Sequence, residues 1–226
     1  MRSQIKAIIF DLSETLIDTQ NFFRGRSIKV NQEILRSYGI YKSLSEIEKA
    51  VKRVYRKTEK YWKKKLSFSY LLCKELKIDV PLKFAKNMDD KFREEFVKSV
   101  QLKRNVKKVL RKLAKKYTLV VLSNYDNKTN QKILSAFGIK KYFKLIVGID
   151  TTGFEKARKI PFLYVLKRLR VKPREVVMVG DNEKQDILPA KLLGIKTIKI
   201  VKNLSESTAA DFKVKKLDEI TYIIFC

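Results

Sequence analysis

Apolar and polar residues alternate in two different patterns along the chain. Short apolar runs typical of buried strands occupy 5–10, 118–124, 143–149, 175–181 and 195–201. Apolar residues recur at helical spacing in the segments between them, at 105–117, 128–138, 160–171 and 184–194. A last short element is expected from Leu217 to Phe225. Strands that alternate with helices indicate parallel pairing and right-handed crossovers.

This alternating region contains several residues that favour the ends of helices. Asn105 is placed to cap the first helix, and Pro161 fits the first turn of the third. Gly138 and Gly194 each follow a helical pattern, as C′ glycines do. The helix that ends at Gly194 is expected even though Pro189 lies inside its pattern.

The segment between the first two strands has a different character. It is rich in lysine and aromatic residues, and its apolar residues are spaced for helices with few turn signals. Ile47, Val51, Val54 and Tyr55 are expected on one helix face. Further helices are expected at 68–78 and 84–100.

The fold class that follows is α/β, a doubly wound (Rossmann-like) parallel sheet core with a small helical domain inserted in it. Residues 1–18 and 101–226 are expected to form the core, and residues 19–100 the helical domain. The first strand must therefore join the sheet across the insertion. Aromatic residues of the insertion, Trp62 among them, are interpreted as its core.

The charge of the chain is far from neutral. Its 226 residues carry a formal net charge of +28, and 45% of them are apolar, which is ordinary for a globular protein. A polyanion partner such as nucleic acid is one interpretation. Because the lysines are spread along the chain, a lysine-rich surface like that of proteins from hot environments is favoured.

Cysteine usage and hydropathy indicate a cytoplasmic protein. Cys73 and Cys226 are too few and too far apart for a disulfide framework, so both are expected as free thiols. No secretory signal begins the chain, and no apolar run is long enough to span a bilayer. No membrane partner is expected, and the oligomeric state is left open.

The chain contains no histidine, and this narrows its chemistry. A Ser-His-Asp triad, a Cys-His dyad and imidazole metal sites are excluded. Proton transfer would have to use carboxylates, lysine, tyrosine or cysteine. A metal site would be oxygen-rich, which favours Mg²⁺.

Polar residues follow the ends of the expected strands. They are Asp11, Ser123 with Asn124, Lys156, Asp181 and Asp186. Carboxyl ends of parallel strands share one edge, where open α/β sheets bind ligands. The three aspartates would supply oxygens for Mg²⁺, while Ser123 and Lys156 would donate to phosphate oxygens. A carboxylate beside a metal and a cation can also be a nucleophile that forms an acyl phosphate.

Four stretches in this order resemble the motifs of the haloacid dehalogenase superfamily. They are "IIFDLSETLID" (8–18), "VVLSN" (120–124), "GFEKARKIPF" (153–162) and "VMVGDNEKQDILPAKLLGIKTI" (177–198). The insertion at 19–100 resembles that superfamily's helical cap, which closes over a phosphate-bearing substrate. The resemblance implies that the protein hydrolyses a small phosphorylated molecule.

The resemblance also implies roles for individual residues. Asp11 matches the nucleophile, and Lys156 the lysine that holds nucleophile and phosphate, with Lys159 as a rival three residues later. Ser123 matches the phosphate-binding hydroxyl, and Asn124 beside it is expected to bind substrate. Asp181 and Asp186 match the acids that bind or order Mg²⁺, to which residue 13 contributes its backbone carbonyl.

Ser13 departs from the pattern of related phosphatases. They usually carry an acid two residues after the nucleophile, which protonates the leaving group and then activates water. A serine hydroxyl does neither near neutral pH, and losing a general acid costs roughly 10²–10⁴ in rate. A slow phosphatase, or one whose leaving group needs no proton, is the leading hypothesis. Glu14 as a substitute acid is the weaker interpretation, because neighbouring side chains diverge.

Two other hypotheses stay open. One is another enzyme of the superfamily, which would act on a halogenated substrate like a haloacid dehalogenase or on a carbon–phosphorus bond like a phosphonoacetaldehyde hydrolase. The dehalogenases need no Mg²⁺ and lack the acid that Asp181 supplies here. The other is a catalytically weak protein that binds a polyanion.

Overall fold

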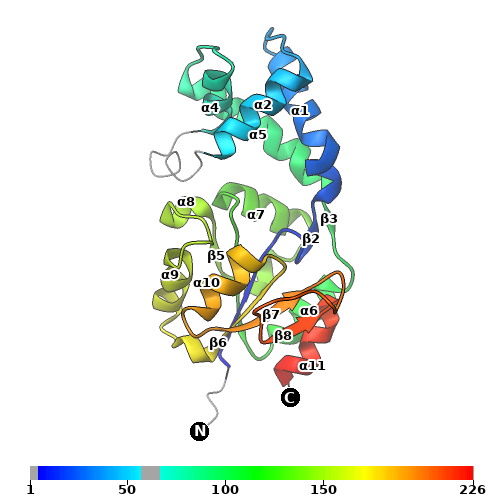
Figure 1. The fold of residues 1–226 in the computed structure, drawn as a ribbon, viewed down its shortest axis with the longest axis vertical. Helices are drawn as coiled ribbons and strands as arrows, with labels where there is room; N and C mark the ends of the chain where they lie inside the picture. The colour runs from blue at the N-terminus through cyan, green and yellow to red at the C-terminus, as the bar shows by residue number, and fades with distance from the viewer. Residues whose placement is uncertain (1–4, 57–66, 226) are drawn as a thin grey trace. The chain divides into compact units, whose positions relative to one another are not determined.

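The computed structural model describes residues 5–56 and 67–225 (Figure 1). Trp62 and Cys226 lie outside the described residues. The chain divides into two compact units. The first comprises residues 1–18 and 101–226, and the second residues 19–100.

A six-stranded parallel sheet forms the centre of the first unit, in the order β5-β4-β1-β6-β7-β8. The strands are β1 Ala7–Phe10, β4 Thr118–Leu122, β5 Phe143–Val147, β6 Val176–Gly180, β7 Lys196–Ile200 and β8 Phe212–Val214. The chain builds outward from β1 in one direction through β5, then returns to add β6, β7 and β8 on its other side. This confirms the predicted doubly wound sheet, although β8 was not predicted.

Helices lie on both sides of this sheet (Figure 1). They are α6 Val106–Leu113, α7 Asn127–Ala136, α8 Ile149–Thr152, α9 Ile160–Leu169, α10 Leu188–Lys191 and α11 Ile220–Phe225. Shorter helical turns are η2 Lys140–Tyr142, η3 Pro173–Glu175, η4 Glu183–Ile187 and η5 Leu217–Glu219.

The middle strand, β1, is buried on both faces. Its four residues have no exposed surface, as expected for a parallel strand covered by helices on each side. Ala7 and Ile9 belong to the cluster that packs on Phe162 and Val165 of α9. The alternate residues of β1 point to the other face. A rigid, fully buried strand thus carries the residue that follows it, Asp11.

The helix ends differ in part from the predicted ones. Gly138 adopts the left-handed conformation after α7, and Pro161 lies in the first turn of α9, as predicted. Asn105 precedes α6 but makes no side-chain cap, because its own backbone is left-handed and its amide donates to Asp218. That helix ends at Leu113 rather than at residue 117.

The segment predicted as one helix at 184–194 is two short ones. A π-helical turn, η4, comes first, and regular α-helix begins only at Leu188. Proline has no N–H to donate to the preceding turn, so Pro189 is accommodated near the start of a helix. Gly194 has a positive φ after α10, as a helix-ending glycine does.

The second unit is helical, as predicted. Its elements are η1 Phe22–Arg26, α1 Ser27–Arg36, α2 Leu44–Tyr55, α4 Phe68–Glu75 and α5 Leu82–Ser99. Helix α1 packs on α2 and α5, and α4 packs on the same two helices. Phe22 contacts Phe96 with ring centroids 4.9 Å apart, and both are buried. Ile47, Val51 and Val54 of α2 are buried, whereas Tyr55 at its end is exposed and contacts Phe68 of α4 with ring centroids 5.5 Å apart.

The two connections between the units are paired with each other. They are β2 Ile17–Asp18 and β3 Gln101–Leu102, which form a short antiparallel sheet. Lys103 follows β3 and donates its backbone N–H to Leu16 O at 2.9 Å. The chain therefore leaves and re-enters the first unit at one place, immediately after the loop that carries Asp11.

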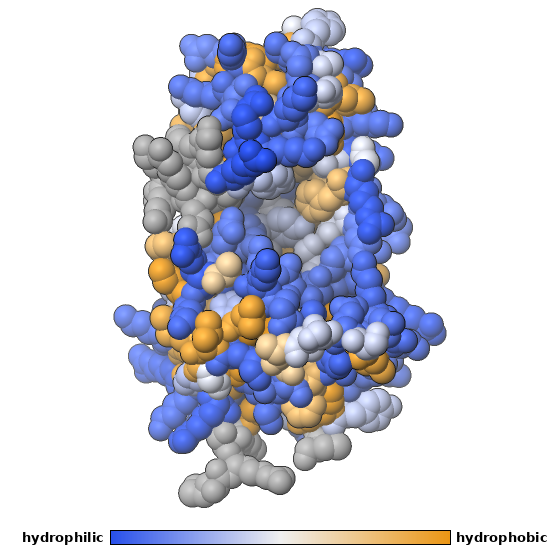
Figure 2. All heavy atoms as spheres, in the orientation of Figure 1, coloured by the Kyte–Doolittle hydropathy of each residue, from blue (hydrophilic) through white to orange (hydrophobic). Residues whose placement is uncertain are grey.

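The surface is hydrophilic over many elements. Figure 2 shows hydrophilic residues over much of one face of each unit, interrupted by apolar patches. No helix within the described parts of the chain combines the length and the apolar character needed to cross a bilayer. Cys73 is buried in α4 as a free thiol.

Candidate active site

The predicted site residues of the first unit follow neighbouring strands. Asp11 follows β1, Ser123 follows β4, and Asp181 follows β6. Asp11 N donates to Val179 O at 2.9 Å, which continues the β1–β6 ladder up to the residue that bears the carboxylate. Because the strands are parallel, these loops meet at the carboxyl edge of the sheet.

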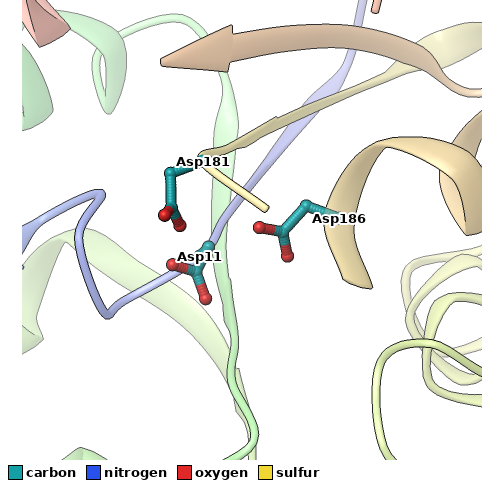
Figure 3. Close-up of side chains that lie close together, drawn as sticks. All are labelled: Asp11, Asp181 and Asp186. Atoms are coloured by element: carbon teal, nitrogen blue, oxygen red, sulfur yellow. The ribbon is translucent and has the colours of Figure 1, made fainter. Parts of the chain in front are cut away.

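Three carboxylates converge at this edge. One oxygen each of Asp11, Asp181 and Asp186 lies within 4.8 Å of the others. Figure 3 shows the three side chains close together, with Asp11 and Asp181 directly after strands β1 and β6 and Asp186 on the helical turn η4. Asp11 and Asp186 are buried, while Asp181 is partly exposed.

Gly180 makes room for one of these acids. A Cβ atom at this position would lie 2.4 Å from Asp186 Oδ2, a distance that real Cβ atoms essentially never show. The same oxygen accepts a hydrogen bond of 3.0 Å from the backbone N–H of Asn182. The glycine at the end of β6 thus lets the Asp186 carboxylate lie against the strand, beside Asp181.

Lys156 neutralises part of this cluster. Its Nζ donates to Asp11 Oδ1 and, at 2.6 Å, to Asp186 Oδ1. The lysine is only 3% exposed, whereas its rival Lys159 is exposed. The structure therefore brings Lys156 into the cluster and leaves Lys159 outside it.

Burial and mutual repulsion change the acidity of these groups. Burial raises the pKa of Asp11 to about 7, with smaller contributions from Asp186 and Asp181, although Lys156 lowers it. Burial and then the Asp186 charge raise the pKa of Asp181 to about 6. Burial lowers the pKa of Lys156, but the Asp11 and Asp186 charges outweigh it and raise this pKa above its ordinary value. The lysine therefore stays charged.

The residues of this cluster fit a divalent cation. Lys156 contacts two of the three carboxylates, so the cluster keeps an excess of negative charge when all three are ionised. Among the described residues, no hydrogen-bond partner reaches Asp11 Oδ2, although this oxygen is buried. Hard oxygen donors of this kind suit Mg²⁺. The backbone carbonyl of Ser13 as a further ligand stays a prediction.

Asn124 positions the lysine. Its Oδ1 accepts a hydrogen bond of 2.9 Å from the backbone N–H of Lys156. Its Nδ2 donates to Gln185 Oε1 at 2.6 Å. Asn124 therefore links the loops after β4, β5 and β6, while its predicted contact with substrate stays a prediction.

Ser123 is buried at the end of β4. Its backbone N–H donates to Val147 O at 3.0 Å, and its Oγ accepts from the backbone N–H of Tyr125 at 3.1 Å. The hydroxyl hydrogen therefore points away from the Tyr125 N–H. Binding of phosphate by this hydroxyl stays a prediction.

Three features of the site were not predicted. Tyr125 donates from its phenol to Ser13 Oγ at 3.3 Å. Lys103 Nζ donates to the backbone carbonyl of Glu14 and lies 3.5 Å from its carboxylate. Glu14 itself has φ of 58°, a left-handed backbone that is uncommon outside glycine. "VGD" did offer a signal for the glycine, whereas nothing local in the sequence marks Tyr125 or Lys103.

Comparisons with known proteins agree on one family. A family model described as haloacid dehalogenase-like hydrolase matches residues 5–194. The chain is 27% identical to a glyceraldehyde 3-phosphate phosphatase from Methanothermobacter thermautotrophicus, covering 95% of this chain and 93% of that protein. It is 28% identical to a phosphoglycolate phosphatase from Vibrio parahaemolyticus, covering 99% of this chain and 97% of that protein.

Solved structures of the family share the whole fold. A 2-haloacid dehalogenase from Pseudomonas syringae superposes with a TM-score of 0.72 at 23% identity, covering 98% of this chain and 99% of that chain. This likeness concerns the fold alone. The family model spans the loops that carry Asp11, Ser123, Lys156, Asp181 and Asp186. The chain therefore belongs to the haloacid dehalogenase-like hydrolases.

Proposed function

We propose that this protein is a Mg²⁺-dependent phosphatase that hydrolyses a small phosphorylated molecule through an aspartyl phosphate at Asp11. The observation that carries the proposal is the buried contact of Lys156 with both Asp11 and Asp186, beside Asp181. This contact holds a positive charge against Asp11, the proposed nucleophile, within an acidic cluster. Phosphoryl transfer depends mainly on positioning and on charges of this kind.

Asp11 Oδ2 is the nucleophilic oxygen in this proposal. The other oxygen, Oδ1, accepts from Lys156, so the ammonium fixes the orientation of the carboxylate. Oδ2 is buried and, within the described chain, has no hydrogen-bond partner that would lower its reactivity. Lys156 also stabilises the negative charge of the transferred phosphoryl group. The Ser123 hydroxyl donates a hydrogen bond to one of the phosphoryl oxygens.

Asp181 and Asp186 would hold Mg²⁺ together with Asp11. The bound ion supplies positive charge that offsets the repulsion between the phosphate and the carboxylates. The orientation of Asp186 is fixed by Lys156 and by the backbone N–H of Asn182. These residues would keep the acids in place whether or not substrate is bound.

The names of the relatives supply substrates to try first. Glyceraldehyde 3-phosphate and phosphoglycolate appear in the names of proteins that match nearly the full length of this chain. The helical unit of residues 19–100 is proposed as the cap domain of the superfamily, the part in which substrate specificity would be encoded. No residue of that unit is assigned to the chemistry.

A metal-dependent assay with an aryl phosphate tests the proposal. Wild-type protein should release inorganic phosphate with Mg²⁺ and lose this activity with EDTA, and Asp11→Asn should be inactive. Asp79→Asn is the matched control, because it makes the same change at an exposed residue of the second unit. No turnover by wild type, or equal turnover by Asp11→Asn, would overturn the proposal.

The acidic cluster also supports phosphatase chemistry over carbon–halogen cleavage. Asp181 lies within the cluster, and the dehalogenases that the chain resembles lack this acid. Chloride release from 2-chloropropionate without Mg²⁺ would favour the dehalogenase hypothesis instead. Trapping of phosphonoacetaldehyde by borohydride on a lysine would favour carbon–phosphorus cleavage. Salt-dependent binding of DNA with no hydrolysis of any phosphate would favour polyanion binding.

A further inference from the structure

We infer that Tyr125 and Ser13 form a neutral hydroxyl pair on the leaving-group side of Asp11. The site is then specific for phosphate compounds whose leaving group departs as a weakly basic oxyanion. Acyl phosphates, aryl and enol phosphates, and phosphoanhydrides belong to this class. The inference rests on the proposed function, and it names the class of substrate.

The first support is how firmly Tyr125 is held. Its backbone N–H donates to Ser123 Oγ, and its carbonyl accepts from the backbone N–H of Ile149 at 3.1 Å. The same carbonyl accepts from the buried side chain of Asn130 at 3.2 Å. Gly148 permits this close approach, since a Cβ there would lie 2.6 Å from the Tyr125 carbonyl oxygen. The loop after β4 is therefore fixed while its phenol donates to Ser13.

The second support is the position of the pair relative to the acidic cluster. Strand β1 lies between β4 and β6 in the sheet. The loop after β6 leads to Asp181 and Asp186, on one side of the Asp11 loop. The loop after β4 provides Tyr125, on the other side. The Asp11 loop is thus bordered by Asp181 and Asp186 on one side and by the phenol of Tyr125 on the other.

This asymmetry orients the substrate. As the bond between phosphorus and the leaving oxygen breaks, that oxygen gains negative charge. Carboxylates would repel it, whereas hydroxyl groups are neutral and donate hydrogen bonds. The leaving oxygen therefore faces Ser13 and Tyr125. Because Tyr125 donates to Ser13 Oγ, the hydrogen of Ser13 points away from the phenol, and Tyr125 acts as a positioning residue for it.

The reaction balances without an acid at residue 13. A carboxylate oxygen of Asp11 bonds to phosphorus, and the leaving oxygen departs with the electron pair of the broken bond. Water then bonds to phosphorus, and the electron pair of the Asp11–phosphorus bond returns to the carboxylate. Both protons of that water leave with the product as dihydrogen phosphate. A strongly basic alkoxide would need a proton that neither hydroxyl supplies near neutral pH, so alkyl phosphates react slowly.

A leaving-group series tests the inference. The substrates are aryl phosphates of graded phenol acidity together with an alkyl phosphate, at fixed pH and saturating Mg²⁺. In wild type, kcat/KM should fall steeply as the leaving group becomes more basic. Ser13→Asp, which restores an acid, should raise the rate of alkyl phosphate hydrolysis by a factor of roughly 10²–10⁴. It should also make kcat/KM depend less on the basicity of the leaving group. Ser13→Ala, which removes only the hydroxyl group, should make kcat/KM fall more steeply with the basicity of the leaving group.

Tyr125→Phe tests the positioning role. It should steepen the dependence on the leaving group while leaving the thermal shift on Mg²⁺ addition unchanged. Tyr142→Phe, at a half-buried tyrosine in η2 of the same unit, should leave the whole series as in wild type. A series for Tyr125→Phe that matches wild type would overturn the role of this residue.

The outcomes separate this inference from the proposed function. If kcat/KM of wild type does not depend on the basicity of the leaving group, and Asp11→Asn loses all activity, the inference is overturned while the proposed phosphatase function stands. Hydrolysis of no substrate in the series would overturn the phosphatase itself. If Ser13→Asp lowers activity toward every substrate and Ser13→Ala does not steepen the series, the hydroxyl pair has no part in leaving-group departure.

Discussion

Lys156 donates a hydrogen bond of 2.6 Å to Asp186 across 30 residues of chain, and both side chains are almost completely buried. The same ammonium donates to Asp11. Because Lys156 contacts two of the three clustered carboxylates, its positive charge offsets part of the repulsion within the cluster. Under the proposed function, loss of Lys156 should therefore affect both stability and activity.

Lys156→Ala should destabilise the metal-free protein by about 3–5 kcal/mol, because it leaves buried carboxylates without their partner. Urea unfolding followed by circular dichroism at pH 8 measures this loss. Lys159→Ala is the matched control, since that lysine is exposed and its loss should change stability by no more than about 0.5 kcal/mol. Equal unfolding midpoints for the two variants would contradict the structural role of Lys156.

Gly180→Ala should disturb Asp186 without altering any charge. The added methyl group would lie 2.4 Å from Asp186 Oδ2, so the acid must move away from the Asn182 N–H and from Lys156. A loss of about 1–3 kcal/mol is expected. The increase in melting temperature on Mg²⁺ addition should shrink as well.

Gly25→Ala provides the control for this substitution. A Cβ atom at Gly25, in the second unit, meets no atom within 4 Å. The melting temperature of Gly25→Ala should therefore be no lower than that of wild type, since alanine favours a helix over glycine, and its response to Mg²⁺ should match that of wild type. A Gly180→Ala protein that behaves in the same way would show that Asp186 tolerates the displacement.

Metal-free stability should depend on pH through Asp11. The pKa of this group is about 7 in the folded protein and 3.8 ordinarily, so between these values the folded state holds more protons than the unfolded state. The free energy of unfolding contributed by Asp11 therefore falls as pH rises through this window, by at most about 1.4 kcal/mol per pH unit.

A comparison with Asp11→Asn isolates this dependence from the other titrating groups. Wild type should lose stability relative to the variant as pH rises from about 4 to about 7, the window set by the Asp11 pKa values. Mg²⁺ should also raise the melting temperature of wild type more at pH 7.5 than at pH 5.5, because protons compete with the cation for the carboxylates. A stability difference independent of pH would contradict a raised Asp11 pKa.

The position in the fold of the candidate site residues that lie next to strands could be predicted from the sequence. Buried apolar runs ending at Asp11, Ser123 and Asp181 are local signals, and parallel pairing brings their ends to one edge without further information. Lys156 was harder to predict, because other lysines lie near it in the sequence and only burial distinguishes it from Lys159.

Contacts that depend on exact loop conformation were not predicted. Tyr125 and Ser13 are 112 residues apart, and their hydrogen bond depends on the register of β1 against β4. Lys103 and Glu14 meet because β2 pairs with β3, two strands too short to leave a periodic pattern. Asn105 has the composition of a helix cap but a left-handed backbone, which sequence pattern alone does not reveal.

Asn124→Ala should lower kcat/KM by about 10²-fold while leaving every charge in place. Its side chain joins the Lys156 backbone to Gln185, and small displacements of a catalytic group are costly. Without this link the ammonium of Lys156 would be held less firmly against Asp11. Steady-state kinetics with an aryl phosphate measures the loss.

Asn21→Ala is the control, since that exposed asparagine makes no side-chain cap for η1, and its kinetics should match wild type. Unchanged kinetics for Asn124→Ala would mean that the hydrogen bonds of Lys156 to Asp11 and Asp186 are sufficient to position it.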